Sequence, residues 1–136
     1  MNTVSVMGVE NFDDIPPGGR LIESKQIHDL FLDIGIPPHL RGYRYLAYAM
    51  ELIGSDSSYM QHLTTRLYID VAEHFETSSA CVGRAMKRAI ANAWAYGNIS
   101  FIHYIFKNCV NPNKGVPTNA LFLSRMYYYL LSIKSK

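Results

Sequence analysis

Apolar residues recur at helical spacing through most of the chain after residue 23. The stretch 78–96 has the sharpest pattern when successive residues are placed about 100° apart. One narrow arc of it is apolar: Val82, Met86, Ala89 and Ala93. The opposite arc is cationic, with small residues beside the charges and no acid: Arg84, Lys87, Arg88, Ala91 and Ala95. This pattern predicts a helix that packs on a core and leaves a cationic face outward.

The same spacing predicts helices over most of the remaining chain: 24–35, 39–53, 59–65, 67–75, 99–106 and 119–133. Ser24 and Thr118 are the expected N-caps of the first and last of these helices. Gly35 is the expected stop of the first, and Gly97 is expected to supply a left-handed residue after 78–96. No segment alternates with period two, so the sequence predicts an all-α protein.

Residues 67–96 match the pattern of a helix-turn-helix. Helix 67–75 is expected to pack against helix 78–96, and either Thr77 or Ser78 can cap the second helix. Such turns usually hold glycine where this chain has Glu76, which is a departure from the pattern.

The chain is expected to form one domain, 24–136, preceded by a flexible tail, 1–23. Paired prolines and paired glycines at 16–19 exclude a regular helix or central strand there. Asp13 and Asp14 lie in this tail without further ligands at suitable spacing, so we interpret them as tail residues rather than a metal site.

Charge is divided along the chain. Residues 1–76 hold five bases and eleven acids, a balance of −6, whereas residues 77–136 hold eight bases and no acid, a balance of +8. The change falls at the start of the cationic helix. A surface without carboxylates is typical of a protein that binds a polyanion.

These patterns make Arg84, Lys87 and Arg88 the main candidates for contact with DNA, because arginine can fork onto guanine O6 and N7. A solvated cationic helix face is the alternative. Ser78 and Ser79 are candidates for phosphate through hydroxyl and backbone N–H groups, or serve as simple caps. Lys114 is a further phosphate candidate, in a loop where lysines are usually just solvated.

The sequence offers no catalytic, metal or cofactor site. Its five histidines lack metalloprotease spacing, and there is neither a serine-hydrolase elbow nor a phosphate-binding glycine loop. Cys81 and Cys109 lie in no metal or redox spacing and are expected to be free thiols. No apolar run reaches about 18 residues and no signal peptide is evident, so we expect a cytoplasmic protein without a membrane span.

From residue 27 onward the chain resembles the C-terminal DNA-binding effector domain of the sporulation initiation regulator family, stage 0 sporulation protein A. The matching stretches occur in order and at matching spacing: Ile34–His39, Gly42–Leu46, Leu67–Ala72, Arg84–Ala85, Ala89–Ile90, Ala93–Trp94, Gly97–Asn98 and Pro117–Asn119.

The resemblance implies a compact bundle of about six helices containing a helix-turn-helix. It implies binding to double-stranded promoter DNA, in the cytoplasm and associated with the nucleoid. It also implies a homodimer or tandem pair formed partly through the last helix, and contact between residues 91–100 and the polymerase sigma subunit. Arg84 matches a base-reading arginine of the family. Cys81 and Gly83 depart from a basic residue and a base-contacting glutamate. The family's phosphoacceptor receiver is not expected in residues 1–23.

Two functions follow as hypotheses. The first is a sequence-specific DNA-binding transcriptional regulator, with helix 78–96 in the major groove. The second is a protein-interaction module that modulates the full-length regulator or RNA polymerase, with DNA binding reduced or lost. Trp94 is interpreted as a core residue, whereas residues 127–129 fit either core plus surface or a dimer interface.

Overall fold

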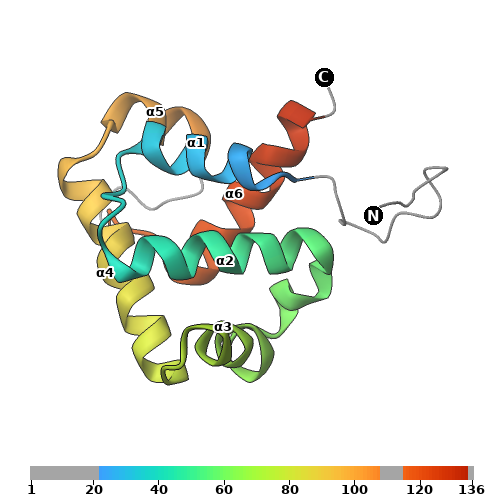
Figure 1. Ribbon diagram of the computed structural model, residues 1–136. Coiled ribbons are helices and arrows are strands. Elements are labelled where there is room, and N and C mark those ends of the chain that lie inside the picture. Colours follow the sequence, from blue (N-terminus) through green and yellow to red (C-terminus); the bar gives the residue numbers. More distant parts are fainter. Residues whose placement is uncertain (1–21, 108–114, 135–136) are drawn as a thin grey trace, which may run out of the picture.

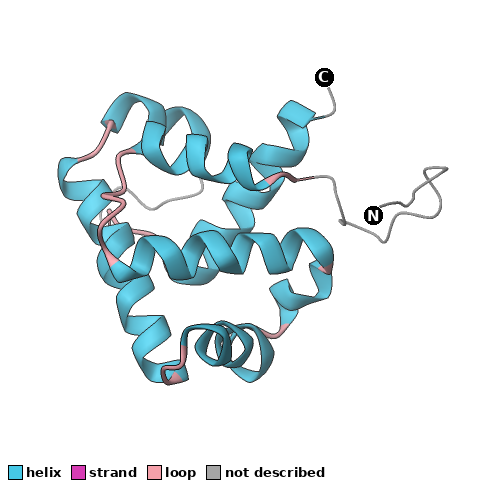
Figure 2. Ribbon diagram, in the orientation of Figure 1, coloured by secondary structure: helices cyan, strands magenta, loops and turns pink. Residues whose placement is uncertain are grey.

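The computed structural model describes residues 22–107 and 115–134 (Figure 1). Six α-helices occupy most of them: α1 (Ser24–Ile34), α2 (Arg41–Ser55), α3 (Tyr68–Phe75), α4 (Ser79–Tyr96), α5 (Ile99–Phe106) and α6 (Asn119–Lys134). Short loops join these helices, and the described residues contain no strand (Figure 2). The all-α prediction is confirmed.

Helix α2 lies at the centre of the bundle and contacts α1, α3, α4 and α6 (Figure 1). The sequence predicts this position, because apolar residues occupy much of its circumference. Tyr43, Leu46, Met50 and Ile53 are all buried along it. Residues of all six α-helices belong to one apolar core. Burying each large apolar side chain stabilises the fold by roughly 1.5–3 kcal/mol.

The start of α1 differs from the prediction that Ser24 is its N-cap. Glu23 is the N-cap, and its backbone N–H donates to Gln26 Oε1 at 3.0 Å in a capping box. The Glu23 side chain in turn accepts from the N3 backbone. Such a reciprocal pair satisfies two N–H groups, that of the N-cap residue and that of N3. At the other end Gly35 has φ 101, as its predicted role as the helix stop requires.

Gly97 also follows α4 as predicted, but the prediction that it adopts a left-handed conformation is wrong, since its φ is −85. Its role is to let the end of α4 approach the end of α1 closely. A Cβ at Gly97 would lie 2.4 Å from the carbonyl oxygen of Ile34, and a Cβ at Gly35 would lie 2.8 Å from Gly97 Cα. The neighbouring Asn98 N–H donates to Ile34 O at 2.8 Å. The end of α4 is therefore fixed against the end of α1.

The helix predicted over 59–65 is replaced by two shorter elements. These are a 3-10 helix, η2 (Ser57–Gln61), and one π-helical turn, η3 (Leu63–Leu67), which runs directly into α3. The periodicity of so short a stretch does not distinguish α from 3-10 or π geometry. Its course depends instead on polar contacts.

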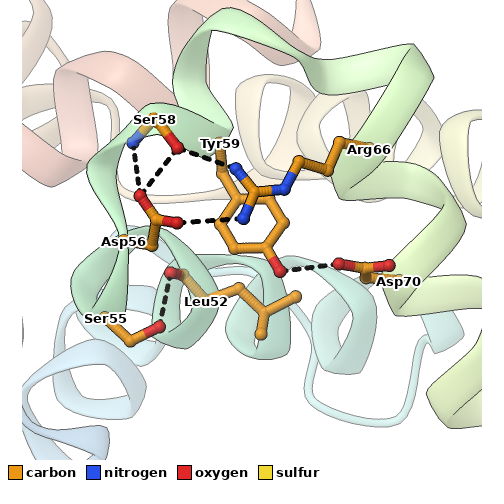
Figure 3. A network of polar contacts seen from close by, with 7 residues as sticks. All are labelled: Leu52, Ser55, Asp56, Ser58, Tyr59, Arg66 and Asp70. Carbon is orange, nitrogen blue, oxygen red and sulfur yellow. Dashed lines mark hydrogen bonds and ion pairs between the residues drawn. The ribbon is translucent and has the colours of Figure 1, made fainter.

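Asp56 and Arg66 organise those contacts (Figure 3). Asp56 Oδ1 accepts from the backbone N–H and the hydroxyl of Ser58, and Asp56 Oδ2 accepts from Arg66 Nη2 at 2.9 Å. The Arg66 guanidinium lies 4.1 Å from the centre of the Tyr59 ring, and the Tyr59 hydroxyl donates to Asp70 at 2.6 Å. The network thus joins the end of α2 to the first turn of α3.

Helix α6 begins as predicted, with Thr118 Oγ1 accepting from the Leu121 N–H at 3.1 Å. Helical spacing predicts one broad buried face, with Tyr127 and Tyr128 beside it: Leu121, Phe122, Met126, Tyr129, Leu130 and Ile133. The observed buried face is shifted from this one. The buried residues are Phe122, Leu123, Met126, Tyr127 and Leu130. Ile133, predicted to face the core, is 39% exposed, and Tyr128 is 58% exposed. Because apolar residues surround this helix, the sequence pattern does not favour one face over its neighbour.

Candidate nucleic-acid interface

Helices α3 and α4 pack against each other and are joined by three residues, 76–78. Glu76 takes the left-handed conformation at φ 57 and ψ 51, in the place where glycine is usual. The Thr77 N–H donates to Ala72 O at 2.9 Å and closes the end of α3. This arrangement fits the helix-turn-helix that the sequence predicts, with a strained residue in the turn.

Ser78 caps α4. Its hydroxyl oxygen accepts from the Cys81 N–H at 3.1 Å, so Ser78 rather than Thr77 fills this role. Ser79 is the first residue of α4 and is half-buried, whereas Ser78 is exposed. Both residues lie at the positive end of the helix dipole.

A single amide sets the position of α4 against α3 and α6. Asn119, the first residue of α6, donates from Nδ2 to the Tyr68 hydroxyl and to Gly83 O, both at 3.0 Å. Sequence reasoning placed Asn119 in a helix start and gave it no other role. Its partners lie 51 and 36 residues away along the chain, so no local pattern connects them.

The two faces of α4 are arranged as predicted. Val82, Met86, Ala89 and Ala93 are fully buried. Arg84, Lys87 and Arg88 are exposed. The ion pairs among the described residues are Lys25–Asp29 and Arg66–Asp56, so none of them engages a cation of α4. The cationic face therefore keeps its charge available for an external anion.

On one side of this face, α4 and the start of α2 form a cavity of about 460 Å³, which we call the arginine groove. Its lining is His39, Leu40, Arg41, Gly42, Tyr45, Cys81, Arg84, Ala85, Arg88 and Ala89. Three guanidinium groups share the groove and no carboxylate lines it. Sequence reasoning missed His39 and Arg41, because only the crossing of α2 over α4 brings them beside Arg84 and Arg88.

On the other side lies a shallower cavity of about 430 Å³, which we call the Gly83 hollow. Its lining is Thr64, Tyr68, Ser79, Ala80, Gly83, Arg84, Lys87 and Asn119. An adjoining cavity shares Thr64, Tyr68, Lys87 and Asn119 and extends along the start of α6 to Val116 and Thr118. Arg84 thus borders both the arginine groove and the Gly83 hollow.

Cys81 is an exposed free thiol on the wall of the arginine groove. Hydrogen bonds from the Ser78 and Thr77 side chains lower its pKa, and the positive charge of Arg84 adds to the effect. Arg84 Nη2 donates to the sulfur at 3.6 Å. Cys81 therefore helps to orient Arg84, and its thiol loses a proton more readily than that of an ordinary cysteine.

Lys114 and Cys109 lie outside the described residues. Within the described part of the chain, no three His, Cys, Asp or Glu side chains form a group suited to a metal ion. Nor does any described helix have the length and apolarity needed to cross a membrane.

An exposed cationic helix held by a preceding helix and a tight turn defines the class of helix-turn-helix DNA-binding modules. Residues 27–130 match the family described as "Sporulation initiation factor Spo0A C terminal". The chain belongs to this family, whose domain is a DNA-binding effector in the regulation of sporulation rather than a catalytic unit. The match runs from α1 into α6 and includes every residue of the arginine groove and the Gly83 hollow.

Proposed function

We propose that the chain is a sequence-specific transcriptional regulator that inserts α4 into the major groove of duplex DNA. The observation that carries this proposal is the exposed face of Arg84, Lys87 and Arg88, without an ion-pair partner among the described residues. A B-form major groove admits one α-helix, and arginine or lysine on such a helix reaches guanine O6 and N7. Domain 24–136 is the proposed effector unit.

The residues around α4 have distinct proposed roles. Arg84 borders both cavities and reads a base, while Lys87 and Arg88 on either flank contact bases or phosphates. Ser78 and Ser79 offer the N-terminal N–H groups of α4 to a phosphate. Lys114, outside the described residues, is kept as a further phosphate contact.

The arginine groove extends the interface beyond α4. His39 and Arg41 are exposed at the start of α2, on the same cavity as Arg84 and Arg88. A helix in the major groove lies between two phosphate backbones, and most protein–DNA hydrogen bonds go to phosphate and sugar. We infer that Arg41 binds a backbone phosphate and fixes the register of α4.

Duplex binding tests the proposal. Duplexes are selected from a random pool, and the affinity for the selected site is measured against salt concentration. Affinity should fall steeply with salt, because bound phosphates release counterions. Arg84→Ala should relax the sequence preference and cost about 1–3 kcal/mol, and Lys87→Ala should lower the salt slope by about 1 if Lys87 contacts phosphate.

Arg44→Ala is the matched control, because Arg44 is exposed on α2 but lines neither cavity. It should alter binding little. Absence of duplex binding at low salt would overturn the proposal. An unchanged footprint in Arg84→Ala would overturn the placement of α4.

One observation favours a second function, that of a protein-interaction module. Tyr96 is 83% exposed and Ile99 is 45% exposed, three residues apart in sequence where α4 ends and α5 begins. Interfaces between proteins are enriched in aromatic residues such as tyrosine. We propose RNA polymerase, through its sigma subunit, as the partner of this surface. A pull-down that retains polymerase after nuclease treatment, from a protein that binds no duplex, would favour this function over the first.

Self-association is proposed through α6, where Tyr128 and Ile133 are exposed. Tyrosine is favoured at such interfaces. Sedimentation with and without a two-site duplex checks this proposal. Because DNA is the proposed ligand, we place the protein in the cytoplasm with the nucleoid, and the proposal requires neither catalysis nor a cofactor.

A further inference from the structure

The Gly83 hollow differs in chemistry from the arginine groove. Gly83 presents no side chain, and a Cβ there would lie 3.3 Å from Tyr68 Cε2 and 3.7 Å from Tyr68 Cδ2. The edge of the Tyr68 ring therefore faces bare helix backbone. Ala80, one turn earlier on α4, adds a methyl group to the same wall.

Two polar groups beside Gly83, its own carbonyl and the Tyr68 hydroxyl, are already engaged. Asn119 Nδ2 donates to both Gly83 O and the Tyr68 hydroxyl, at 3.0 Å each. The exposed lining of the hollow is mainly apolar, and Tyr68, Ala80, Thr64 and Ser79 contribute to it. Arg84 and Lys87 border this apolar floor.

The two cations restrict what can occupy the hollow. A nucleic acid drawn to Arg84 and Lys87 brings its base edges over the space between them. Among the groups that the four base pairs present in the major groove, the one apolar group is the C5-methyl of thymine. A Cβ at Gly83 would already touch the Tyr68 ring, so a methyl group would not enter between them but lie over Gly83, Ala80 and the edge of the ring. An amino group placed there would lose its hydrogen bonds to water.

We propose that the Gly83 hollow receives the C5-methyl group of one thymine and that Gly83, Tyr68 and Ala80 make the chain select thymine at that position. This inference rests on the proposed insertion of α4 in the major groove. It gives the protein a second source of base specificity, the absence of a side chain at residue 83. This source adds to the base contact proposed for Arg84.

The test replaces each thymine of the selected duplex in turn by deoxyuridine, which removes only the C5-methyl group. One replacement should weaken binding by about fourfold, since burying a methyl-sized group is worth roughly 0.8 kcal/mol and a tenfold change about 1.4 kcal/mol. The other replacements should have little effect.

Gly83→Ala fills the hollow while favouring the helix, because alanine has a higher helix propensity than glycine. This variant should bind the duplex with thymine at the sensitive position no more tightly than the duplex with deoxyuridine there. Arg44→Ala is the control, because Arg44 lines neither cavity, and this variant should keep the methyl effect. The inference is overturned if the methyl effect persists in Gly83→Ala. It is also overturned if the duplex binds but no thymine in it is sensitive to replacement. Either result leaves the proposed function standing. No bound duplex overturns the proposed function as well.

Discussion

Glu76 carries backbone strain at the centre of the proposed DNA-binding unit. Its φ of 57 lies in the left-handed region, which costs a residue with a Cβ roughly 1–2 kcal/mol. The turn has the shape that a glycine would allow, although the residue is glutamate. The strain is therefore held by the packing of α3 against α4.

Replacing Glu76 by glycine should raise the free energy of unfolding by roughly 1 kcal/mol, because glycine adopts this conformation without steric cost. Urea denaturation measures the change. Glu73→Gly is the matched control, since Glu73 lies inside α3 and glycine there should cost about 1 kcal/mol. A Glu76→Gly protein less stable than the original would contradict this account of the turn.

Cys81 should react faster with iodoacetamide than an ordinary cysteine does, because its pKa is lowered by the hydrogen bonds of the Ser78 and Thr77 side chains. A lowered pKa produces thiolate at lower pH. The midpoint of the rate against pH should therefore fall below that of an ordinary free thiol measured in the same way.

The iodoacetamide adduct of Cys81 would occupy the arginine groove and should weaken duplex binding. Bound duplex should in turn slow the reaction of Cys81 with iodoacetamide. Cys81→Ser identifies the signal from Cys81 in a chain that also contains Cys109. A midpoint at or above the free-thiol value would contradict the lowered pKa.

At the scale of elements, the crossing of α2 and α4 depends on Gly42. A Cβ there would lie 2.1 Å from the carbonyl oxygen of Ala85 and 2.7 Å from Ala89 Cβ. The contacted atoms belong to the backbone and to an alanine, so neither group can move away by changing its rotamer. This close crossing also brings Arg41 to α4 and shapes the arginine groove.

Gly42→Ala should lower the free energy of unfolding by roughly 1–3 kcal/mol, the usual cost of overpacking, despite its better helix propensity. Thermal and urea denaturation both report it. Gly83→Ala in α4 is the matched control, because its Cβ meets only the Tyr68 side chain, whose nearest carbon lies at 3.3 Å. If Gly42→Ala and the original protein have the same free energy of unfolding, α2 and α4 can move apart without loss of stability.

The junction of α2 and α3 should weaken in acid. Hydrogen bonds from Ser58 and Arg66 lower the pKa of Asp56 to about 2. Because this value lies below the ordinary one of 3.8, the stabilisation is complete above about pH 4 and is lost as pH falls toward 2. The original protein should have a higher free energy of unfolding than Asp56→Asn, and this difference should shrink as the pH falls from about 4 toward 2.

Urea denaturation at pH 6, 4, 3 and 2 measures this difference. Glu73→Gln removes one exposed carboxylate elsewhere and controls for the change in net charge. A difference between the original and Asp56→Asn that stays constant from pH 6 to 2 would contradict the lowered pKa of Asp56.

At the scale of the whole molecule, one core joins all six α-helices, so unfolding should be a single cooperative step. Trp94 is the only tryptophan, and its ring packs 4.9 Å from that of Phe106 and 6.1 Å from that of Phe122, between centres. Its fluorescence and the far-ultraviolet circular dichroism should therefore give the same urea midpoint. An earlier fluorescence midpoint would mean that α4, α5 and α6 loosen before the rest.

The sequence was informative where structure depends on residues close along the chain. Spacing alone gave α5 its bounds and separated the buried Met86 from the exposed Lys87. It was uninformative where distant segments meet. Nothing local distinguishes Arg41 from any other exposed arginine, and its place in the arginine groove follows from the close approach allowed by Gly42. The role of Gly97 depends likewise on Ile34, far earlier in the chain.

The amide of Asn119 has a further consequence for how the protein is made. Both helices of the proposed DNA-reading unit are complete once residue 96 has been synthesised. The group that joins Tyr68 to Gly83 is added only at residue 119. On the ribosome, the unit therefore has its full sequence before it has its final geometry. A transplanted fragment that ends at α4 would carry the cations without the residue that positions them.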